Sequence, residues 1–170
     1  MCRAPFKEKG TRATTLLELI HSGLCGPMET IAFGGYRYFL TLIDDYSRKV
    51  FVYFLKNKSE VPDIFEVFKA MVEKENGQTI KCLCSDNGGE YSSTRYEEFL
   101  KKNGIKHQKT VPYTPQQYGT AERANRSIVE EARSLLNEAG LDKRFWSEAV
   151  NTAVYLLNRL PTRALHQAMW

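Results

Sequence analysis

A short apolar strand that runs into an acid-containing turn constrains the fold of this 170-residue chain more than any other feature. Residues 80–84, Ile-Lys-Cys-Leu-Cys, are mostly apolar, and their composition predicts a buried strand. The run Asp86-Asn87-Gly88-Gly89 predicts a turn, because glycine adopts backbone angles that other residues avoid. We therefore expect the Asp86 carboxylate at the end of a strand and the mouth of a loop, a position suited to a hard cation such as Mg²⁺.

A second cluster of polar residues lies downstream, in residues 113–126, Tyr-Thr-Pro-Gln-Gln-Tyr-Gly-Thr-Ala-Glu-Arg-Ala-Asn-Arg. The proline and the glycine of this run predict a loop over residues 110–119, and a strongly helical segment follows it. Glu122 is expected in the first turn of that helix, and Asn125, three residues further on, shares its face. Thirty-five residues separate Asp86 from Glu122.

The composition indicates one globular domain. The chain is 42% hydrophobic and 12% aromatic, and a chain of this length buries roughly 70% of the surface that it exposes when unfolded. No apolar run approaches the ~20 residues that a membrane-spanning helix needs, and the N-terminus has no apolar signal-peptide core. The net charge of +4 permits a nucleic-acid partner without requiring one.

Cysteine and histidine spacing predicts no zinc site. The four cysteines, at positions 2, 25, 82 and 84, form no Cys-x-x-Cys motif. This pattern favours reduced thiols in an intracellular protein. The histidines His21, His107 and His166 are scattered and form no ligand pair, so we expect His21 and His107 to make local hydrogen bonds.

The order of the predicted elements indicates an α/β fold. Turn residues and apolar periodicity predict strands at residues 16–21, 36–43, 49–55, 80–84 and 105–109, and helices at residues 59–76, 91–103, 120–139 and 142–160. The first three strands form an antiparallel meander, whereas the later strands need helical crossovers. The result is a mixed five-stranded sheet with helices on both sides.

Two features of this pattern are expected to be structural. The adjacent acids Asp44 and Asp45, next to Ser47 and Arg48, are expected to stabilise a turn and an ion pair rather than to act in catalysis. The first predicted helix carries an apolar stripe that we expect to be core packing, namely Val61, Ile64, Phe65, Phe68, Met71 and Val72.

Taken together, these motifs resemble the catalytic core of retroviral and retrotransposon integrases, specifically that of the copia-type elements. Besides the Asp-Asn-Gly-Gly run, the resemblance rests on residues 24–28, 38–48, 113–117 and 145–153. It extends from about Thr11 to Leu165. It implies a ribonuclease-H-like fold that brings Gly23, Asp86 and Glu122 towards one end of the sheet.

The resemblance also implies a site of three carboxylates that hold two divalent metal ions, Mg²⁺ or Mn²⁺, for 3′-end processing and strand transfer on DNA. Asp86 and Glu122 match two of these carboxylates. The first belongs to the motif His-Ser-Asp-Leu-Cys-Gly-Pro, and this chain has Gly23 at the aspartate position. Because the first aspartate is expected to bridge both metals, its loss is expected to weaken metal binding and to leave little or no strand transfer.

DNA contacts are a separate implication of the resemblance. Contacts to the DNA backbone come from basic and amide groups and carry little sequence information. The candidates are Asn87, Gln116, Gln117, Arg123, Asn125 and Arg126. Arg123 and Arg126 flank Glu122, so the alternative is that both pair with acids on the helix surface. The family usually has Asn where this chain has Tyr118, which weakens the carry-over at that position.

The expected domain organisation is a basic linker at residues 1–15, an integrase core-like domain at 16–165 and a truncated tail at 166–170. By the resemblance, the linker is the end of a segment that follows a zinc-binding domain, and that domain is missing here. The implied partners are the element ends, target DNA and further copies of the chain in a homo-oligomer. The implied location is the nucleus, with no membrane association.

Three functional interpretations stay open at this point. In the first, the chain is a degenerate integrase core that keeps the fold but has an inactive or impaired site. Alternatively, it is a competent DNA-joining enzyme in which Gly23 is a variant or engineered change. The third interpretation is a non-catalytic module that keeps the scaffold to bind DNA or to dimerise. Salt-sensitive DNA binding without metal-dependent cleavage would favour the third.

Overall fold

The computed structural model describes residues 12–110 and 115–160, the side chains of residues 115–118 excepted. Its strands and helices follow the order β1 (Leu19–Cys25), β2 (Tyr38–Asp44), β3 (Val50–Leu55), α1 (Val61–Asn76), β4 (Cys82–Ser85), α2 (Thr94–Lys102), β5 (Lys106–Lys109), α3 (Pro115–Ala139) and α4 (Trp146–Leu157). Short 3₁₀ turns precede α1, α2 and α4, namely η1 (Lys58–Glu60), η2 (Gly89–Tyr91) and η3 (Lys143–Phe145). No helix within these described ranges is both long and apolar enough to span a bilayer.

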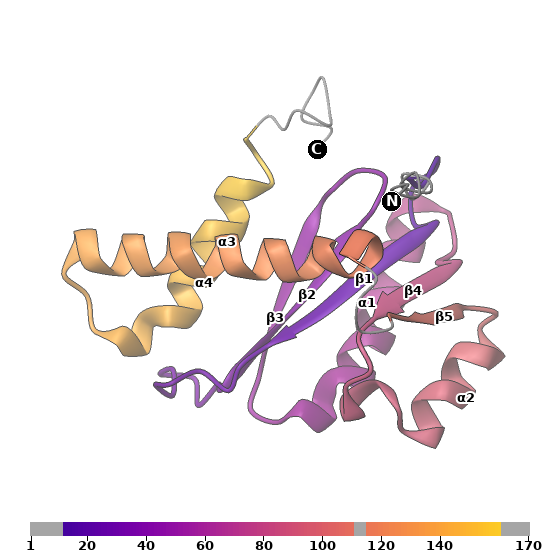
Figure 1. Ribbon diagram of the computed structural model, residues 1–170, viewed down its shortest axis with the longest axis horizontal. Helices are drawn as coiled ribbons and strands as arrows, with labels where there is room; N and C mark the ends of the chain where they lie inside the picture. Colours follow the sequence, from indigo (N-terminus) through magenta and orange to yellow (C-terminus); the bar gives the residue numbers. More distant parts are fainter. Residues whose placement is uncertain (1–11, 111–114, 161–170) are drawn as a thin grey trace, which may run out of the picture.

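The five strands form one sheet in the order β3-β2-β1-β4-β5 (Figure 1). β1 pairs antiparallel with β2, and β2 pairs antiparallel with β3, so these three strands are the predicted meander. β4 lies parallel to β1 and β5 lies parallel to β4. α1 and α2 supply the helical crossovers that parallel neighbours need. The predicted mixed five-stranded sheet is therefore confirmed.

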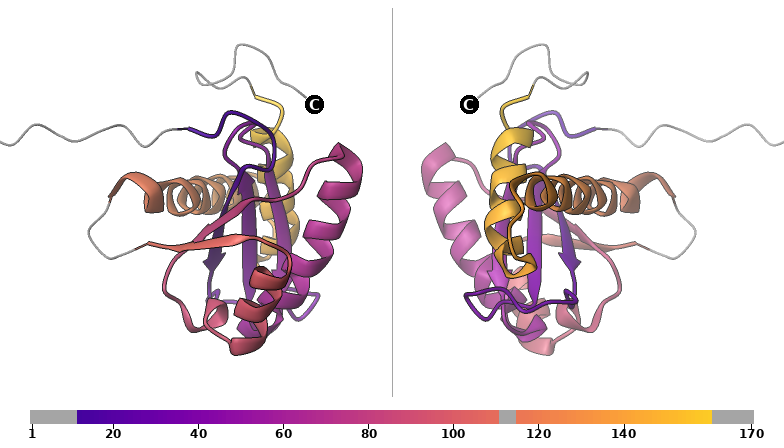
Figure 2. Two further views of the ribbon diagram at one scale, coloured as in Figure 1. Left: turned by 90° about the vertical axis from the view of Figure 1, so that its right-hand side faces the viewer. Right: turned by 90° about the vertical axis from the view of Figure 1, so that its left-hand side faces the viewer.

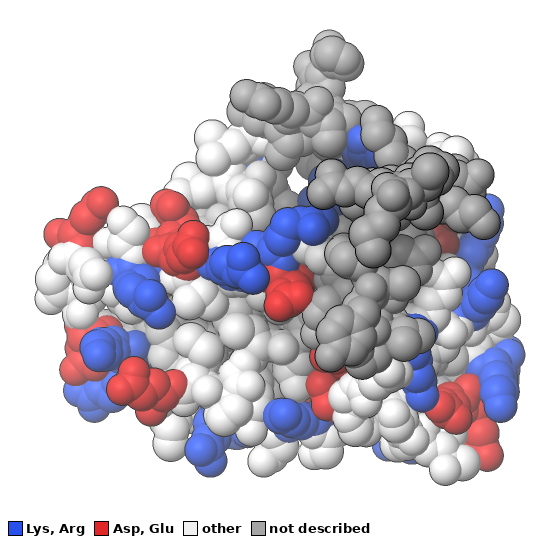
Figure 3. Space-filling view, viewed as in Figure 1, with Lys and Arg blue, Asp and Glu red and all other residues white. Residues whose placement is uncertain are grey.

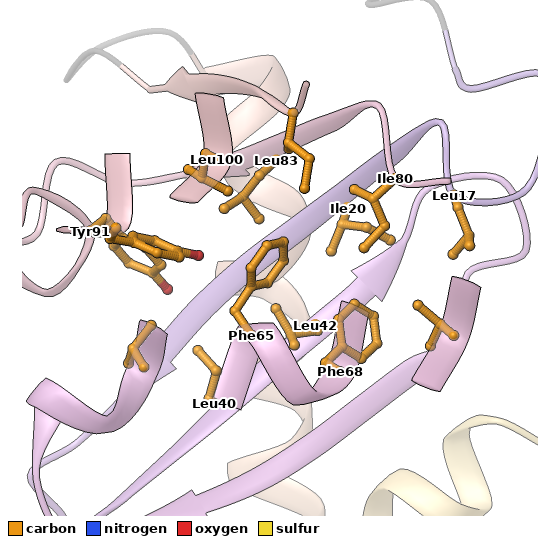
Figure 4. Packing of buried hydrophobic residues seen from close by; sticks show 14 of the residues in the cluster. Leu17, Ile20, Leu40, Leu42, Phe65, Phe68, Ile80, Leu83, Tyr91 and Leu100 are labelled. Atoms are coloured by element: carbon orange, nitrogen blue, oxygen red, sulfur yellow. The ribbon is translucent and has the colours of Figure 1, made fainter. Parts of the chain in front are cut away.

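Side chains that alternate along the central strands build one core on each face of the sheet. On β2, Leu40 and Leu42 pack towards α1 and α2, whereas Phe39 and Ile43 pack towards α3 and α4. Figure 2 shows α1 and α3 on opposite sides of the sheet, and α4 packs in the same core as α3. In the first core, Phe65 of α1 lies among the aliphatic side chains of the strands (Figure 4). The predicted helices on both sides are confirmed.

The first strand begins later than predicted. β1 starts at Leu19 instead of residue 16, because the chain bends just before it. Leu17 has a left-handed backbone, with φ at 62°, and donates its N–H to the Asp44 carboxylate at 2.8 Å. Gly23 consequently lies inside β1, where it pairs with Thr41 of β2, and the residues before and after it in β1 are paired with β2 as well.

The helices also differ from the prediction at their ends. α1 begins at Val61, after η1, and α2 begins at Thr94, where the Ser93 side chain caps its first turn. α4 ends at Leu157, before the predicted end at residue 160. On the apolar stripe predicted for α1, Met71 is the exception, because it is 38% exposed while its neighbours on the stripe pack into the core.

The adjacent acids Asp44 and Asp45 close the turn between β2 and β3, as predicted. Asp44 is 2% exposed and accepts hydrogen bonds of 2.7–2.8 Å from two backbone N–H groups and from Ser47 Oγ. Asp45 lies 2.8 Å from His21 Nε2 and 3.4 Å from an Arg48 guanidinium nitrogen. Both carboxylates are therefore committed to holding this turn.

The environment of Asp45 also decides its protonation. Burial alone would raise the pKa of Asp45, but the hydrogen bonds from His21 and from the Ala13 N–H, together with the charge of Arg48, lower it to about 2. The end of the predicted linker packs here as well, since the Arg12 guanidinium donates to two main-chain oxygens of the turn at 2.8 and 3.3 Å. Asp45 is thus an ionised structural group at neutral pH.

Candidate functional site

An open cleft of about 510 Å³ lies where β1 and β4 meet α3. Its lining includes Gly23, Asp86, Glu122, Asn125 and Arg126, all of which the sequence had singled out. β1 and β4 are paired in parallel, so they carry their residues to the same edge of the sheet. The fold therefore brings both predicted carboxylates to the cleft that also contains the glycine.

Asp86 follows directly on the last residue of β4 and turns the chain. Its Oδ1 accepts the Gly88 N–H at 2.8 Å, which fixes the carboxylate in the turn. Within the described residues, its Oδ2 accepts no hydrogen bond. One carboxylate oxygen of Asp86 is therefore held by the protein, and the other is available to a ligand in the cleft.

A buried serine–histidine pair supports the Asp86 turn. Ser85 is 2% exposed, and its Oγ donates to the Asp86 carbonyl oxygen at 3.0 Å. The same Oγ lies 2.8 Å from His107 Nε2. Because a serine hydroxyl has one hydrogen, we assign the His107 Nε2–H as the donor in this pair. Burial lowers the pKa of His107, and the charge of Lys109 acts in the same direction, so the ring is neutral at pH 7.

Glu122 lies further along its helix than predicted. α3 begins at Pro115, so the predicted loop over residues 110–119 is too long, and Glu122 falls just past the second turn instead of in the first. Proline suits the first turn of a helix, where its missing N–H would have no partner in any case. Gln116 and Gln117 lie in this first turn, and their side chains fall outside the described residues.

Of the remaining DNA-contact candidates, two line the cleft and two lie outside it. Asn125 and Arg126 line the cleft. Arg123 is exposed, and its guanidinium folds back along α3, outside the lining. Asn87 also lies outside it and donates from Nδ2 to the Thr110 carbonyl oxygen at 3.2 Å. Neither Arg123 nor Arg126 forms an ion pair within the described part of the chain.

Sequence reasoning missed two charged residues of the cleft. Glu130 and Arg133 lie on α3 and line the cleft beyond Arg126. They stand four and seven residues after Arg126, a helical spacing that would have placed them on the same face. Acidic and basic side chains are interspersed over the face seen in Figure 3.

Gly23 supplies no ligand, and none of the described neighbours replaces it. Thr41 lies opposite Gly23 on β2, but its Oγ1 donates to Asn125 Oδ1 at 2.7 Å. Cys25 and Cys84 line the cleft, yet burial raises the pKa of both, that of Cys84 to about 11, so both stay protonated thiols. The described residues contain no group of three His, Cys, Asp or Glu side chains that could hold a metal ion.

The donor chemistry of the cleft fits one divalent cation and does not fit two. Mg²⁺ is usually bound by one or two carboxylates together with waters and substrate phosphates, and Asp86 with Glu122 provides that number. Two cations held close together repel each other, and a ligand shared between them has to offset this. Position 23 offers none, and Asp44 and Asp45 are committed to their turn, outside the cleft.

Comparison with known proteins agrees with this geometry. Residues 22–115 match the family model described as the integrase core domain. The chain is 52% identical over 160 residues to the retrovirus-related Pol polyprotein from transposon TNT 1-94 of Nicotiana tabacum. It is 38% identical over 163 residues to the corresponding polyprotein from transposon RE2 of Arabidopsis thaliana. These matches cover 94% and 96% of this chain but 12% and 11% of the polyproteins, so the chain spans about one tenth of their length.

A solved structure shares the fold. A chain from the structure of a simian T-cell lymphotropic virus intasome in complex with the PP2A regulatory subunit B56 gamma superposes with a TM-score of 0.69 at 18% identity. The match covers 92% of this chain and 53% of that one. It supports the predicted ribonuclease-H-like arrangement of sheet and helices. The chain therefore belongs to the integrase core domain family, and it resembles the integrase cores of copia-type retrotransposon Pol polyproteins.

Proposed function

We propose that this chain is an integrase core that binds DNA and at most one divalent cation, and that it carries out little or no strand transfer. The observation that carries the proposal is Gly23, which lines the cleft beside Asp86 and Glu122 without a side chain. The scaffold and two carboxylates of the site are kept, whereas the ligand that would join two metals is lost.

Asp86 and Glu122 would hold the single cation, either Mg²⁺ or Mn²⁺. Such a cation, when bound, supplies charge that polarises a phosphoryl oxygen and lowers the pKa of a bound water. The Gly88 N–H keeps Asp86 oriented through Oδ1, and Oδ2 would be the oxygen that binds the cation. Changes in residues that merely orient metal ligands cost roughly 10–100-fold in affinity or activity, so the loss of a bridging ligand is expected to cost at least that much.

Asn125, Arg126 and Arg133 are the groups that we propose to contact the DNA backbone from the cleft. They lie along one face of α3, and guanidinium and amide groups of this kind bind phosphate oxygens without reading bases. Asn87, Arg123 and the two glutamines of the first turn of α3 remain candidates for contacts outside the cleft. Binding of this type weakens as salt concentration rises.

The proposed partners follow from the relatives. The similar proteins are transposon Pol polyproteins, and the solved neighbour is an intasome. We propose that this chain, within a longer polyprotein product, binds element ends and target DNA in the nucleus and assembles with further copies of itself. Its whole-protein activity would then depend on segments that lie outside the 170 residues.

Metal-dependent nicking and joining of a branched DNA substrate tests the proposal. We expect the chain to show no joining above that of a variant with both Asp86→Asn and Glu122→Gln. Metal-dependent joining by the chain, abolished in the double variant, would overturn the proposal and favour a competent enzyme. Binding of the same DNA should persist in both proteins and should weaken with salt.

A non-catalytic DNA-binding role is the second candidate function. Arg126 and Arg133 of α3, which line the cleft, favour it. An Arg126→Gln, Arg133→Gln variant removes two positive charges from the cleft. Under this role, DNA affinity falls and its salt dependence becomes shallower by about two charges. Unchanged affinity and salt slope would remove the cleft from consideration as a DNA-binding surface.

A further inference from the structure

A side chain at position 23 would point towards α3. Alternate residues of a strand face opposite sides of the sheet, and on β1 Cys25, two residues after Gly23, packs against the core under α3 and α4. Ile20 faces the other way, into the core under α1. The Cα of Gly23 therefore stands at the contact between the sheet and the helix that carries Glu122.

A side chain at position 23 would meet this helix at its first atom. A Cβ built on Gly23 would lie 2.9 Å from Ala121 Cβ, 2.9 Å from Asn125 Nδ2 and 3.4 Å from Thr41 Oγ1. Carbon atoms that are not bonded pack at about 3.5–4.0 Å. A residue other than glycine, whatever its charge, therefore fits at position 23 only if the strand or α3 shifts.

The neighbours cannot simply turn away. Ala121 Cβ is attached directly to the backbone of α3 and has no rotamer that would move it. The Asn125 amide is held by the hydrogen bond from Thr41. α3 is itself packed on the sheet through Ile128 and Ala132, which are 1% and 4% exposed. A side chain at position 23 therefore requires α3 to shift or Ala121 to lose its methyl group.

We infer that α3 occupies the space of the first carboxylate, and that Ala121 decides whether a carboxylate can stand at position 23. The inference rests on the proposed function, which takes position 23 as the place of the missing metal ligand. Gly23→Asp alone strains the contact with α3 and does not rebuild the site. Gly23→Asp together with Ala121→Gly opens the space and completes the set of three carboxylates.

Thermal unfolding of a double-variant cycle tests the packing. Gly23→Ala and Gly23→Asp should each lower Tm by roughly 3–10 °C, the first without adding a charge. Ala121→Gly should lower Tm in the parent chain, because glycine weakens a helix interior. In the Gly23→Ala and Gly23→Asp backgrounds the same substitution should raise Tm.

The expected result is therefore that the change in Tm caused by Ala121→Gly reverses its sign when position 23 carries a side chain. The matched control is Ala132→Gly, another buried alanine of α3, which should lower Tm in all three backgrounds. If Ala121→Gly lowers Tm by the same amount with Gly, Ala or Asp at position 23, the two positions are independent. That outcome would overturn the inference.

The rise in Tm on addition of excess Mn²⁺ tests the rebuilt site without an activity assay. We expect a larger rise in Gly23→Asp, Ala121→Gly than in the parent or in Gly23→Asp alone, and its loss when Glu122→Gln is added. An equal rise in Gly23→Asp alone would overturn the inference. If Ala121→Gly raises Tm in the Gly23→Asp background but Mn²⁺ gives no further rise, the packing inference holds and the proposed role of position 23 as a metal-ligand position fails. The two failures are therefore distinguishable.

Discussion

Asp44 and Asp45 at the end of β2 are 2% and 5% exposed and have their oxygens occupied by protein donors, whereas Asp86 and Glu122 line an open cleft. In sequence the two pairs look alike, since each has an acid where a strand runs into a turn. In the structure their surroundings differ in the number of N–H and O–H groups that point at the carboxylates.

This difference separates acids that build the fold from acids that are available for chemistry. Each region also contains a buried histidine. His21 pairs directly with Asp45, whereas His107 hydrogen-bonds to Ser85 and supports the main chain at Asp86. We therefore expect changes in the first region to act on stability and changes in the second to act on ligand binding.

The largest effect is expected at Asp44. Asp44→Ala leaves buried N–H donors without an acceptor, and the free energy of unfolding should fall by about 3–5 kcal/mol. Urea denaturation measures this directly. The control is Asp63→Ala, which removes an exposed acid paired with Arg95 on the surface and should cost less than about 1 kcal/mol. Equal effects of the two substitutions would show that the Asp44 hydrogen bonds contribute little.

A smaller, pH-dependent effect is expected at Asp45. The pKa of Asp45 is lowered from 3.8 to about 2, so its ionised form stabilises the fold at and above the unfolded pKa and this contribution is lost as pH falls through about 2. The shift corresponds to about 2 kcal/mol. The stability difference between the chain and Asp45→Asn should therefore shrink by that amount between about pH 5 and about pH 2. A difference that does not change with pH would contradict the assignment.

Thr41 connects the sheet to the cleft and should show an intermediate effect. Thr41→Val keeps the shape of the side chain but removes the donor to Asn125 Oδ1, and we expect a loss of about 1–2 kcal/mol in the free energy of unfolding. Thr152→Val on the exposed face of α4 is the matched control, with an expected change near zero. If both threonines tolerate valine equally, the Asn125 amide is not held by Thr41.

The smallest effect on stability is expected at the cleft acids themselves. Asp86→Asn keeps an oxygen for the Gly88 N–H, and Glu122→Gln lies on an exposed helix face, so each should change the free energy of unfolding by no more than about 0.5 kcal/mol. Both should abolish any rise in Tm caused by Mn²⁺. A loss of stability at Asp86 as large as that at Asp44 would erase the distinction between the two regions.

The sequence predicts the sheet well because its signals are local. The alternation of Phe39, Leu40 and Leu42 places β2 between two cores, and the Asp44-Asp45 pair indicates the turn. The same reasoning brings Asp86 and Glu122 to one cleft, because strand order and crossover rules leave few topologies.

The close contact between Gly23 and Ala121 could not be predicted in this way. It depends on how far α3 sits from the sheet, which is set by packing between segments almost one hundred residues apart. The sequence predicts the start of α3 too late, because Pro115 and Gly119 are typical loop residues, although a proline is favourable in the first turn of a helix.

Calorimetric titration of the chain with Mn²⁺ tests the central claim most directly, because it counts the cations that the cleft can hold. We predict at most one weakly bound ion per chain, with the heat removed by Asp86→Asn, because the described residues offer no third metal-binding side chain close enough to Asp86 and Glu122 to bridge a second cation. Tight binding of two Mn²⁺ ions per chain would contradict the claim, since some other group would then have to take the place of the carboxylate missing at Gly23.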